Sequence, residues 1–207
     1  MTTQLSTLFN FSIPQTFAKA VFNLIGWRVD TLYPPEKKYI LVGAHHTSNW
    51  DLPLGILFSL ASGIKFNFLA KDEAFRWPLG GIMRWLGGVP VNRRAHTNFV
   101  DQIAKTFAER EHLIIAITPE GTRKRSEYWK TGFYYIALEA KVPIALGALD
   151  YGKKCIGIGK MLIPSGDLEA DFEIIRAFYA DKKGKFPHQH GEIRPRPQDA
   201  SPGSPKK

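Results

Sequence analysis

The sequence predicts an α/β fold: a single domain with a mostly parallel central sheet flanked by helices, preceded by an N-terminal amphipathic helix. Two observations indicate this class. Short apolar runs of strand length alternate with longer segments of helical periodicity along most of the chain. The chain also has 207 residues, 44% of them hydrophobic, which is enough to bury one substantial core.

The N-terminal segment, residues 1–30, contains the predicted amphipathic helix. Apolar Phe17, Val21 and Leu24 recur at helical spacing, while polar residues fall on another face. The polar residues interrupt the segment too often for a membrane-spanning helix, and no charged leader with a cleavage site precedes it. Two interpretations stay open: a helix lying on a membrane, or one packed on its own domain. We expect a peripheral protein on the cytoplasmic face of the membrane.

Residues 31–181 form the predicted main domain. Strands are predicted at 39–44, 65–70, 89–92, 113–117, 143–149, 154–158 and 160–163, and helices at 52–62, 78–86, 98–110, 131–140 and 167–180. Most strands are nearly continuous apolar runs, as in sheets covered on both faces, and the helical segments supply the crossovers between parallel strands. The last strands are expected to pair as an antiparallel hairpin.

Residues 182–207 predict a basic, Pro-rich and disordered tail. It holds seven Lys or Arg, two acidic residues and five Pro, so it carries +5 of the net charge of +9. Such a tail could attract acidic lipid headgroups or an acidic carrier protein. Nucleic acid is not an expected partner, because half of the excess charge lies in this tail and no recognised binding module is visible.

Basic and aromatic residues also alternate within the main domain, from residue 65 to residue 94. Six Lys or Arg accompany five Phe or Trp in this stretch. This composition suits a membrane interface, where Trp prefers the headgroup zone and long basic side chains reach lipid phosphates. The same pattern would result from core aromatic residues with a solvated basic face, and both interpretations stay open.

The most informative motif is the pair His46 and Asp51, in the run HHTSNWD between a predicted strand and a predicted helix. A histidine titrates near neutral pH and can accept a proton from an attacking hydroxyl. A carboxylate bonded to its other ring nitrogen would hold the required tautomer and stabilise the imidazolium. The alternative is structural, with Asp51 capping the helix and His46 as a loop residue.

Three further segments follow in order: GGVPVNR at 87–93, PEGTR at 119–123 and VPI at 142–144. With the His-x4-Asp pair, this set resembles the glycerolipid acyltransferase family, whose best-known members are the 1-acyl-sn-glycerol-3-phosphate acyltransferases. The resemblance runs from about Tyr39 to Leu149. The PEGTR run is its most specific element.

The resemblance implies roles for eight residues. His46 and Asp51 would be the catalytic dyad, and the residues associated with the acyl acceptor and its phosphate would be Gly88, Arg93, Glu120, Gly121, Thr122 and Arg123. After Ile144 the chain continues with Ala145 rather than the valine-proline type pair usual in the family, which bears on the shape of the acyl pocket.

Physical chemistry supports part of this assignment. Gly121 lets the backbone turn and present amide groups to an anion, and Arg123 offers a planar fork matched to phosphate. Two arginine clusters, around Arg93 and Arg123, could face one phosphate. Backbone amides near Gly121, or a nearby donor such as Thr122, could stabilise an oxyanion.

Other chemistries have no motif in the chain. The six His show no metal-ligand spacing, so neither a metal nor another cofactor is expected. A single cysteine, Cys155, excludes an internal disulfide framework. There is no Gly-x-Ser-x-Gly elbow and no Walker-type phosphate loop.

The expected function is transfer of an acyl group from acyl-CoA or acyl carrier protein to the hydroxyl of a lysophospholipid, such as 1-acyl-glycerol-3-phosphate. The substrates follow from the resemblance. A groove for the acyl chain is expected among apolar residues of 52–69 or 75–91. The alternatives are the same chemistry on another lyso-lipid, for example a lyso-aminolipid, and a non-catalytic basic protein that binds lipid surfaces.

Overall fold

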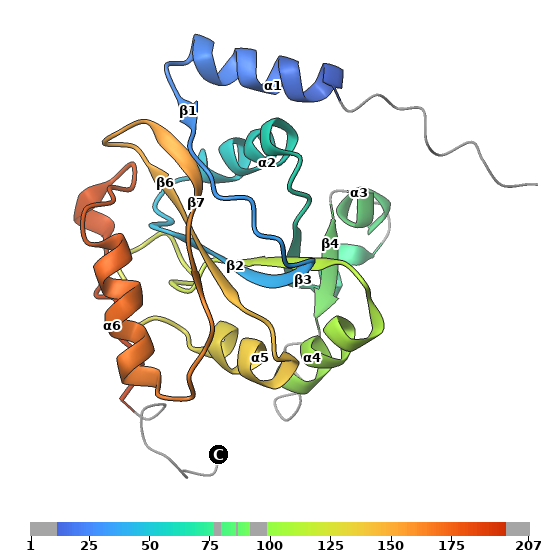
Figure 1. Cartoon of the computed structure of the whole chain (residues 1–207), viewed down its shortest axis with the longest axis vertical. Coiled ribbons are helices and arrows are strands. Elements are labelled where there is room, and N and C mark those ends of the chain that lie inside the picture. Colours follow the sequence, from blue (N-terminus) through green and yellow to red (C-terminus); the bar gives the residue numbers. More distant parts are fainter. Residues whose placement is uncertain (1–11, 77–79, 86, 92–98, 198–207) are drawn as a thin grey trace, which may run out of the picture.

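The computed structural model of the chain describes residues 12–76, 80–85, 87–91 and 99–197. Within them lies a seven-stranded sheet with the order β1-β7-β6-β2-β5-β3-β4 (Figure 1). Neighbouring strands run parallel except β6 and β7, which are antiparallel. The predicted α/β class with a mostly parallel sheet is confirmed.

The elements follow the predicted order closely. The strands are β1 (Arg28–Val29), β2 (Lys38–Ala44), β3 (Asn67–Lys71), β4 (Gly88–Val91), β5 (Leu113–Ile117), β6 (Ile144–Asp150) and β7 (Cys155–Leu162). The helices are α1 (Ser12–Leu24), α2 (Asp51–Ser62), α3 (Gly80–Trp85), α4 (Phe99–Glu109), α5 (Gly132–Ala140) and α6 (Leu168–Tyr179), with 3-10 turns at Asp72–Phe75 and Pro187–Gln189. The short edge strand β1 was not predicted.

The central strand β2 determines where the site forms. Its residues 39–42 are all buried because both faces of the sheet are covered. It pairs in parallel with β5 on one side and with β6 on the other. The carboxyl ends of these three strands therefore meet at one edge of the sheet, where ligands bind in open α/β folds.

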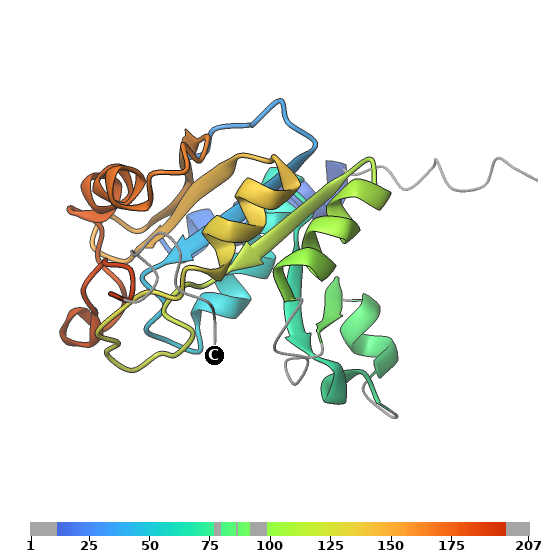
Figure 2. The ribbon, with the colours of Figure 1, turned by 90° about the horizontal axis from the view of Figure 1, so that it is seen from below.

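Helices cover both faces of the sheet. One core cluster joins the sheet to α4, α5 and α6 through residues such as Phe107, Phe133 and Phe172. A second cluster joins the opposite face to α1 and α2 through Phe22 and Phe58. In Figure 1, α1 and α2 lie above the sheet and α4 and α5 below it, and Figure 2 shows α4 and α5 from that lower side.

Strand β7 corrects one prediction. The two strands expected at 154–158 and 160–163 form one strand, which pairs antiparallel with β6 and shifts register between Leu146 and Gly147. Gly159, the residue between the two predicted strands, lies inside this single strand. A Cβ atom there would lie 2.7 Å from the ring of Phe178, so the glycine makes room for α6 within a continuous strand.

Helix α1 has apolar residues on two sides. Ala18 and Phe22 are buried, and α1 packs against α2. Phe17 and Leu24, by contrast, are 66% and 87% exposed. The helix therefore packs on its own domain and still presents a second apolar surface. No helix in the described ranges is both long and apolar enough to cross a bilayer.

The segment 182–197 corrects a second prediction, because it packs on the domain and does not form a disordered tail. It contains the 3-10 turn Pro187–Gln189, and Trp129 forms a parallel bridge with Pro195. The amide of Trp129 donates to the carbonyl of Arg194 at 2.9 Å. Residues 198–207 of the predicted tail lie outside the described residues.

Candidate active site

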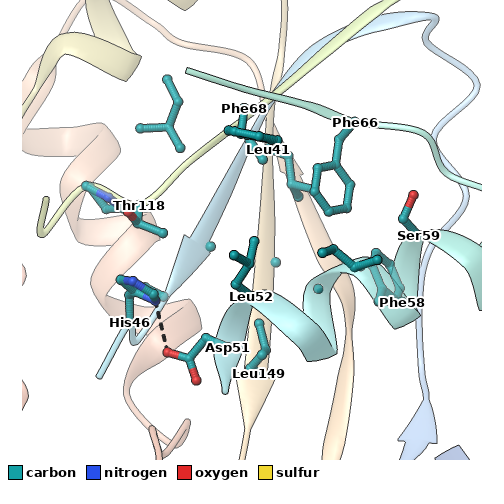
Figure 3. Close-up of a pocket in the computed structure, with 18 of the residues that line it drawn as sticks. Leu41, His46, Asp51, Leu52, Phe58, Ser59, Phe66, Phe68, Thr118 and Leu149 are labelled. Atoms are coloured by element: carbon teal, nitrogen blue, oxygen red, sulfur yellow. Dashed lines mark ion pairs between the residues drawn. The ribbon is translucent and has the colours of Figure 1, made fainter. Parts of the chain in front are cut away.

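A large cavity of about 1130 Å³ opens at the carboxyl edge of β2, β5 and β6 and runs along α2. Most of its lining is apolar. Figure 3 shows His46 and Asp51 at one end and Phe58, Ser59 and Phe66 toward the other. Of the two segments in which the acyl groove was expected, 52–69 supplies much of the lining. From 75–91 only Gly87 contributes within the described part.

His46 and Asp51 form the predicted contact. His46 follows β2 and Asp51 begins α2, so the turn between strand and helix brings the two side chains together. Nδ1 of His46 lies 2.9 Å from Oδ2 of Asp51, and both residues line the cavity (Figure 3). Because Nδ1 is committed to the carboxylate, Nε2 is the nitrogen that can exchange a proton with a ligand.

The Asp51 carboxylate is held by more than the histidine. The backbone amides of Thr47 and Ser48 each donate to Oδ2 at 3.0 Å, and the hydroxyl of Tyr151 donates to Oδ1 at 2.7 Å. Asp51 also lies in the first turn of α2, where the helix dipole favours a negative charge. The carboxylate is therefore fixed at both oxygen atoms.

These contacts keep Asp51 ionised. Burial would raise its pKa, but the hydrogen bonds from His46, Tyr151 and the Ser48 backbone outweigh it and lower the pKa below its ordinary value. A fixed negative charge beside Nδ1 stabilises the imidazolium that forms when His46 accepts a proton. The pair has the geometry of a general base and its orienting acid.

Tyr151 is a site residue that the sequence reasoning missed. It follows β6, the neighbour of β2, and its ring packs edge-on against Trp27 with centroids 4.9 Å apart. Burial and the bond to Asp51 raise its pKa, so it remains a hydroxyl donor. The feature that could have identified Tyr151 is its position directly after β6, the strand that lies next to β2 in the sheet.

Glu120 is buried against the loop between β2 and α2, which carries His46. Its Oε1 accepts from the backbone amide of His46 at 3.3 Å and lies 3.8 Å from Nδ1 of His45. Glu120 does not appear in the cavity lining, whereas its neighbours Pro119 and Gly121 do. The contacts of Glu120 are therefore with the loop that carries the dyad.

Burial changes the charge state of this cluster. It raises the pKa of Glu120 to about 7, against hydrogen bonds from the backbone of Glu120 and His46. Burial also lowers the pKa of His45 to about 4, with a further contribution from nearby His190. His45 is therefore neutral at pH 7.

The PEGTR segment forms a tight turn after β5. Gly121 has a φ of 65°, a conformation that favours glycine, and its amide donates to the carbonyl of Thr118 at 3.1 Å. The Gly121 amide already has a partner within the turn, and an oxyanion role for backbone amides near Gly121 or for Thr122 stays a prediction. Gly121 and Arg123 line the cavity.

The remaining predicted residues lie apart from the cavity lining or outside the described residues. Thr122 is exposed, and its Oγ1 accepts from the amide of Lys124 at 3.2 Å. Gly88 begins β4, and its neighbour Gly87 reaches the lining instead. Arg93 belongs to residues 92–98, which the structure does not describe.

Lys130 is a second residue that the sequence reasoning missed. It lines the cavity, and its side chain lies over Gly121: a Cβ atom at that glycine would be 2.7 Å from Nζ and 2.9 Å from Cε. The glycine thus makes room for a second cation in the cavity lining, in addition to Arg123. In the described ranges no cluster of three or more His, Cys, Asp or Glu could hold a metal ion.

Comparison with known proteins identifies the family and the fold. A family model described as Acyltransferase matches residues 28–145, more than half of the chain. The chain therefore belongs to the acyltransferase family and is an acyltransferase. Among solved structures it is similar to the 1-acyl-sn-glycerophosphate (LPA) acyltransferase PlsC from Thermotoga maritima, with a TM-score of 0.55 and 20% identity. That likeness covers 84% of this chain and 81% of the other, and it shows a shared fold. Comparison with curated proteins found no match.

Proposed function

We propose that this acyltransferase moves a fatty acyl group from a thioester donor to the free hydroxyl of a lysophospholipid such as 1-acyl-glycerol-3-phosphate. The observation that carries the proposal is the His46–Asp51 pair, with its 2.9 Å contact, at one end of a largely apolar cavity. The name of the structural relative from Thermotoga maritima supports the choice of acceptor. The donor is acyl-CoA or acyl carrier protein, and the reaction needs no bound cofactor.

The proposed mechanism is direct transfer without an acyl-enzyme. Nε2 of His46 accepts the proton of the acceptor hydroxyl while that oxygen attacks the thioester carbon. The tetrahedral intermediate then collapses as the carbon–sulfur bond breaks, and the departing thiolate takes the proton from His46. Asp51 holds the ring and balances its charge at each stage.

We assign the acceptor phosphate to the two cations at the PEGTR turn. Arg123 and Lys130 both line the cavity, Lys130 packs over Gly121, and the two positive charges match a phosphate monoester. Arg93 stays in the proposal on the strength of its motif. Holding the phosphate fixes the hydroxyl near the thioester carbon, which converts the encounter into an oriented reaction.

The acyl chain is assigned to the apolar length of the cavity. Leu41 and Phe58 line it, as does Phe66, and these side chains have no hydrogen-bonding groups to leave unsatisfied. An apolar groove of this kind stabilises a hydrocarbon chain by removing it from water, at about 0.8 kcal/mol per CH₂ group.

Membrane attachment is the last part of the proposal. Phe17 and Leu24 of α1 are exposed, and so are Leu52 and Ile56 of α2, which also line the cavity. We propose that these helices rest on the cytoplasmic face of the membrane as a peripheral anchor, so that the cavity can receive lipid substrates.

One assay tests the proposed function. Purified protein is given one acyl-CoA or one acyl carrier thioester, with a panel of acceptors that includes a lysophosphatidate, a neutral monoacylglycerol and a lyso-aminolipid. Acylation of the lysophosphatidate with release of free thiol supports the proposal. Preference for the lyso-aminolipid would overturn the acceptor assignment. Thiol release from no combination, with retained binding to anionic vesicles, would point to the non-catalytic alternative.

A further inference from the structure

The segment from Lys183 to Pro195, here called the C-terminal strap, crosses the carboxyl edge of the sheet beside the catalytic loops. One end is tied to the end of β6: the amide of Tyr151 donates to the carbonyl of Lys183 at 2.8 Å. The amide of Lys183 donates back to Oδ1 of Asp150 at 3.3 Å. The other end is tied by the bridge between Trp129 and Pro195. The strap is thus anchored at both ends.

The middle of the strap binds the loop that carries the dyad. The amide of Phe186 donates to Oγ1 of Thr47 at 3.2 Å. The side-chain amide of Gln189 faces the carbonyl oxygens of Thr47 and Arg123, and because only its nitrogen can bond to them we assign the nitrogen to that side. In this orientation it donates to the carbonyl of Thr47 at 3.1 Å and to the carbonyl of Arg123 at 2.7 Å. One glutamine therefore joins the catalytic loop to the turn that carries Arg123.

His190 forms a second contact between the strap and the loop that carries the dyad. Its ring stacks on His45 with centroids 3.8 Å apart and planes 10° from parallel. Its Nε2 accepts from the amide of Gly184 at 2.9 Å, which folds the strap back on itself. A Cβ atom at Gly184 would lie 2.8 Å from Oγ1 of Thr47 and 2.9 Å from Nε2 of His190, so the packing leaves no free space.

Thr47 connects the strap to catalysis. Its backbone amide donates to Oδ2 of Asp51, while its carbonyl and hydroxyl oxygens are both held by the strap. If the strap moves, the backbone amide of Thr47 moves with it. This amide donates to the carboxylate that orients His46. A shift of the order of 1 Å in such an arrangement can cost roughly a hundredfold in rate.

We propose that Gln189 and His190 are positioning residues, which hold the loop of the His46–Asp51 dyad and the turn of Arg123 at one fixed separation. This inference rests on the proposed function. Both residues lie beyond residue 145, outside the segment that matches the family model, so they add to the part of the site that the family match covers.

The test replaces Gln189 in the full chain. Gln189→Met keeps the length of the side chain but cannot donate to either carbonyl, and we expect kcat to fall about tenfold or more. The matched control is His188→Ala, which removes an exposed side chain from the same turn and should leave kcat unchanged. Gly184→Ala is the second variant. Its added methyl group would clash with Oγ1 of Thr47 and push the strap away from that residue, without removing a hydrogen-bonding group.

A double variant separates positioning from general loss of stability. If Gln189 acts through Arg123, then Gln189→Met should raise the KM for a phosphate-bearing acceptor much less in an Arg123→Ala background than in the wild type. Melting curves confirm that each variant is folded. Wild-type kcat and KM in both Gln189→Met and Gly184→Ala would overturn the proposal.

Amide hydrogen exchange gives a measurement independent of activity. The amides of Thr47 and Ser48, and those of residues 120–124, should exchange faster in Gln189→Met than in the wild type or in His188→Ala. This measurement decides the role of the strap even if the protein acylates none of the acceptors tested. In that case the proposed function fails while the structural coupling stands. Unchanged exchange would overturn the coupling.

Discussion

The hydroxyl of Tyr151 donates to Oδ1 of Asp51 at 2.7 Å, although the two residues are a hundred positions apart in the chain. The same carboxylate contacts His46 through its other oxygen. The His46–Asp51 pair is therefore one part of a three-residue chain of hydrogen bonds that runs from the end of β6 to the cavity. Such chains fix the direction of an imidazole more tightly than a single contact does.

Tyr151→Phe should reduce kcat by roughly 10- to 100-fold, because a hydrogen bond to a charged group is worth about 1.5–3 kcal/mol. KM should change little, since Tyr151 does not line the cavity. The loss of this bond also removes one cause of the lowered pKa of Asp51. Steady-state kinetics with a saturating thioester measure the effect, and an unchanged kcat would show that the tyrosine has no part in catalysis.

His46→Ala should lower kcat by about a thousandfold or more while the melting temperature stays close to that of the wild type. The ring is the proposed base, and removal of a general base costs about 10²–10⁴ in rate. It is also partly exposed, so little packing is lost. The measurement is thiol release per enzyme, and full activity in this variant would end the base assignment.

Lys130→Met and Arg123→Ala should each raise the KM for a phosphate-bearing acceptor by roughly tenfold. The reason is that a charge-assisted hydrogen bond to phosphate contributes about 1.5–3 kcal/mol to binding. A neutral acceptor should be affected much less by either change. Arg125→Ala is the matched control: it removes an exposed cation that does not line the cavity. Equal losses with both acceptors would contradict the phosphate assignment.

The free energy of unfolding should depend on pH through Glu120 and His45. Burial raises the pKa of Glu120 from 4.5 to about 7, so the folded carboxyl keeps a proton that the unfolded one loses, and stability falls as pH rises through this window. Burial lowers the pKa of His45 from 6.5 to about 4, so the unfolded ring binds more protons and stability rises between these values. The two effects oppose each other between pH 4.5 and 6.5.

Glu120→Gln should therefore leave the rise due to His45 uncompensated. Relative to the wild type, this variant should gain roughly 1–3 kcal/mol in unfolding free energy between pH 4.5 and pH 7.5. Urea unfolding at four pH values measures this, with Glu139→Gln, an exposed glutamate of α5, as the control. Parallel profiles for Glu120→Gln and the wild type would show that Glu120 ionises normally.

Replacing Phe17 and Leu24 together by Ser should weaken binding to anionic vesicles by roughly 100- to 10,000-fold, because each exposed side chain would lose about 1.5–3 kcal/mol of apolar burial in the lipid. Neither residue is buried in the domain, so the fold should be retained. Ile163→Ser, which removes an apolar side chain that is 81% exposed beyond the end of β7, is the control. Unchanged vesicle sedimentation would remove α1 from the proposed anchor.

Much of the fold could be predicted because buried parallel strands appear in sequence as continuous apolar runs. Strand β2 and helix α2 are within a residue of their predicted limits. The contact between His46 and Asp51 could be predicted too, because both residues lie in one short turn. The contact of Tyr151 with Asp51 joins neighbouring strands of the sheet and left no such local pattern, and this is why Tyr151 was missed. Lys130 lies only nine residues from Gly121, but the irregular segment between β5 and α5 has no periodicity that predicts their contact.

The prediction of a disordered tail was wrong at 182–197 for a physical reason. The prediction rested on amino-acid composition, which indicates how much apolar area a segment can bury. This segment is held instead by hydrogen bonds from its backbone amides and by the stacking of two imidazole rings. Gly159 lies between the two strands predicted at 154–158 and 160–163, and in the structure it marks the close approach of a neighbouring side chain within one strand.

The closeness of Lys130 to Gly121 links two positions that are nine residues apart. Any side chain at position 121 would displace the ammonium group that now occupies its place. Relatives with a larger residue at position 121 should therefore lack a long cation at position 130. The two positions should change together during evolution.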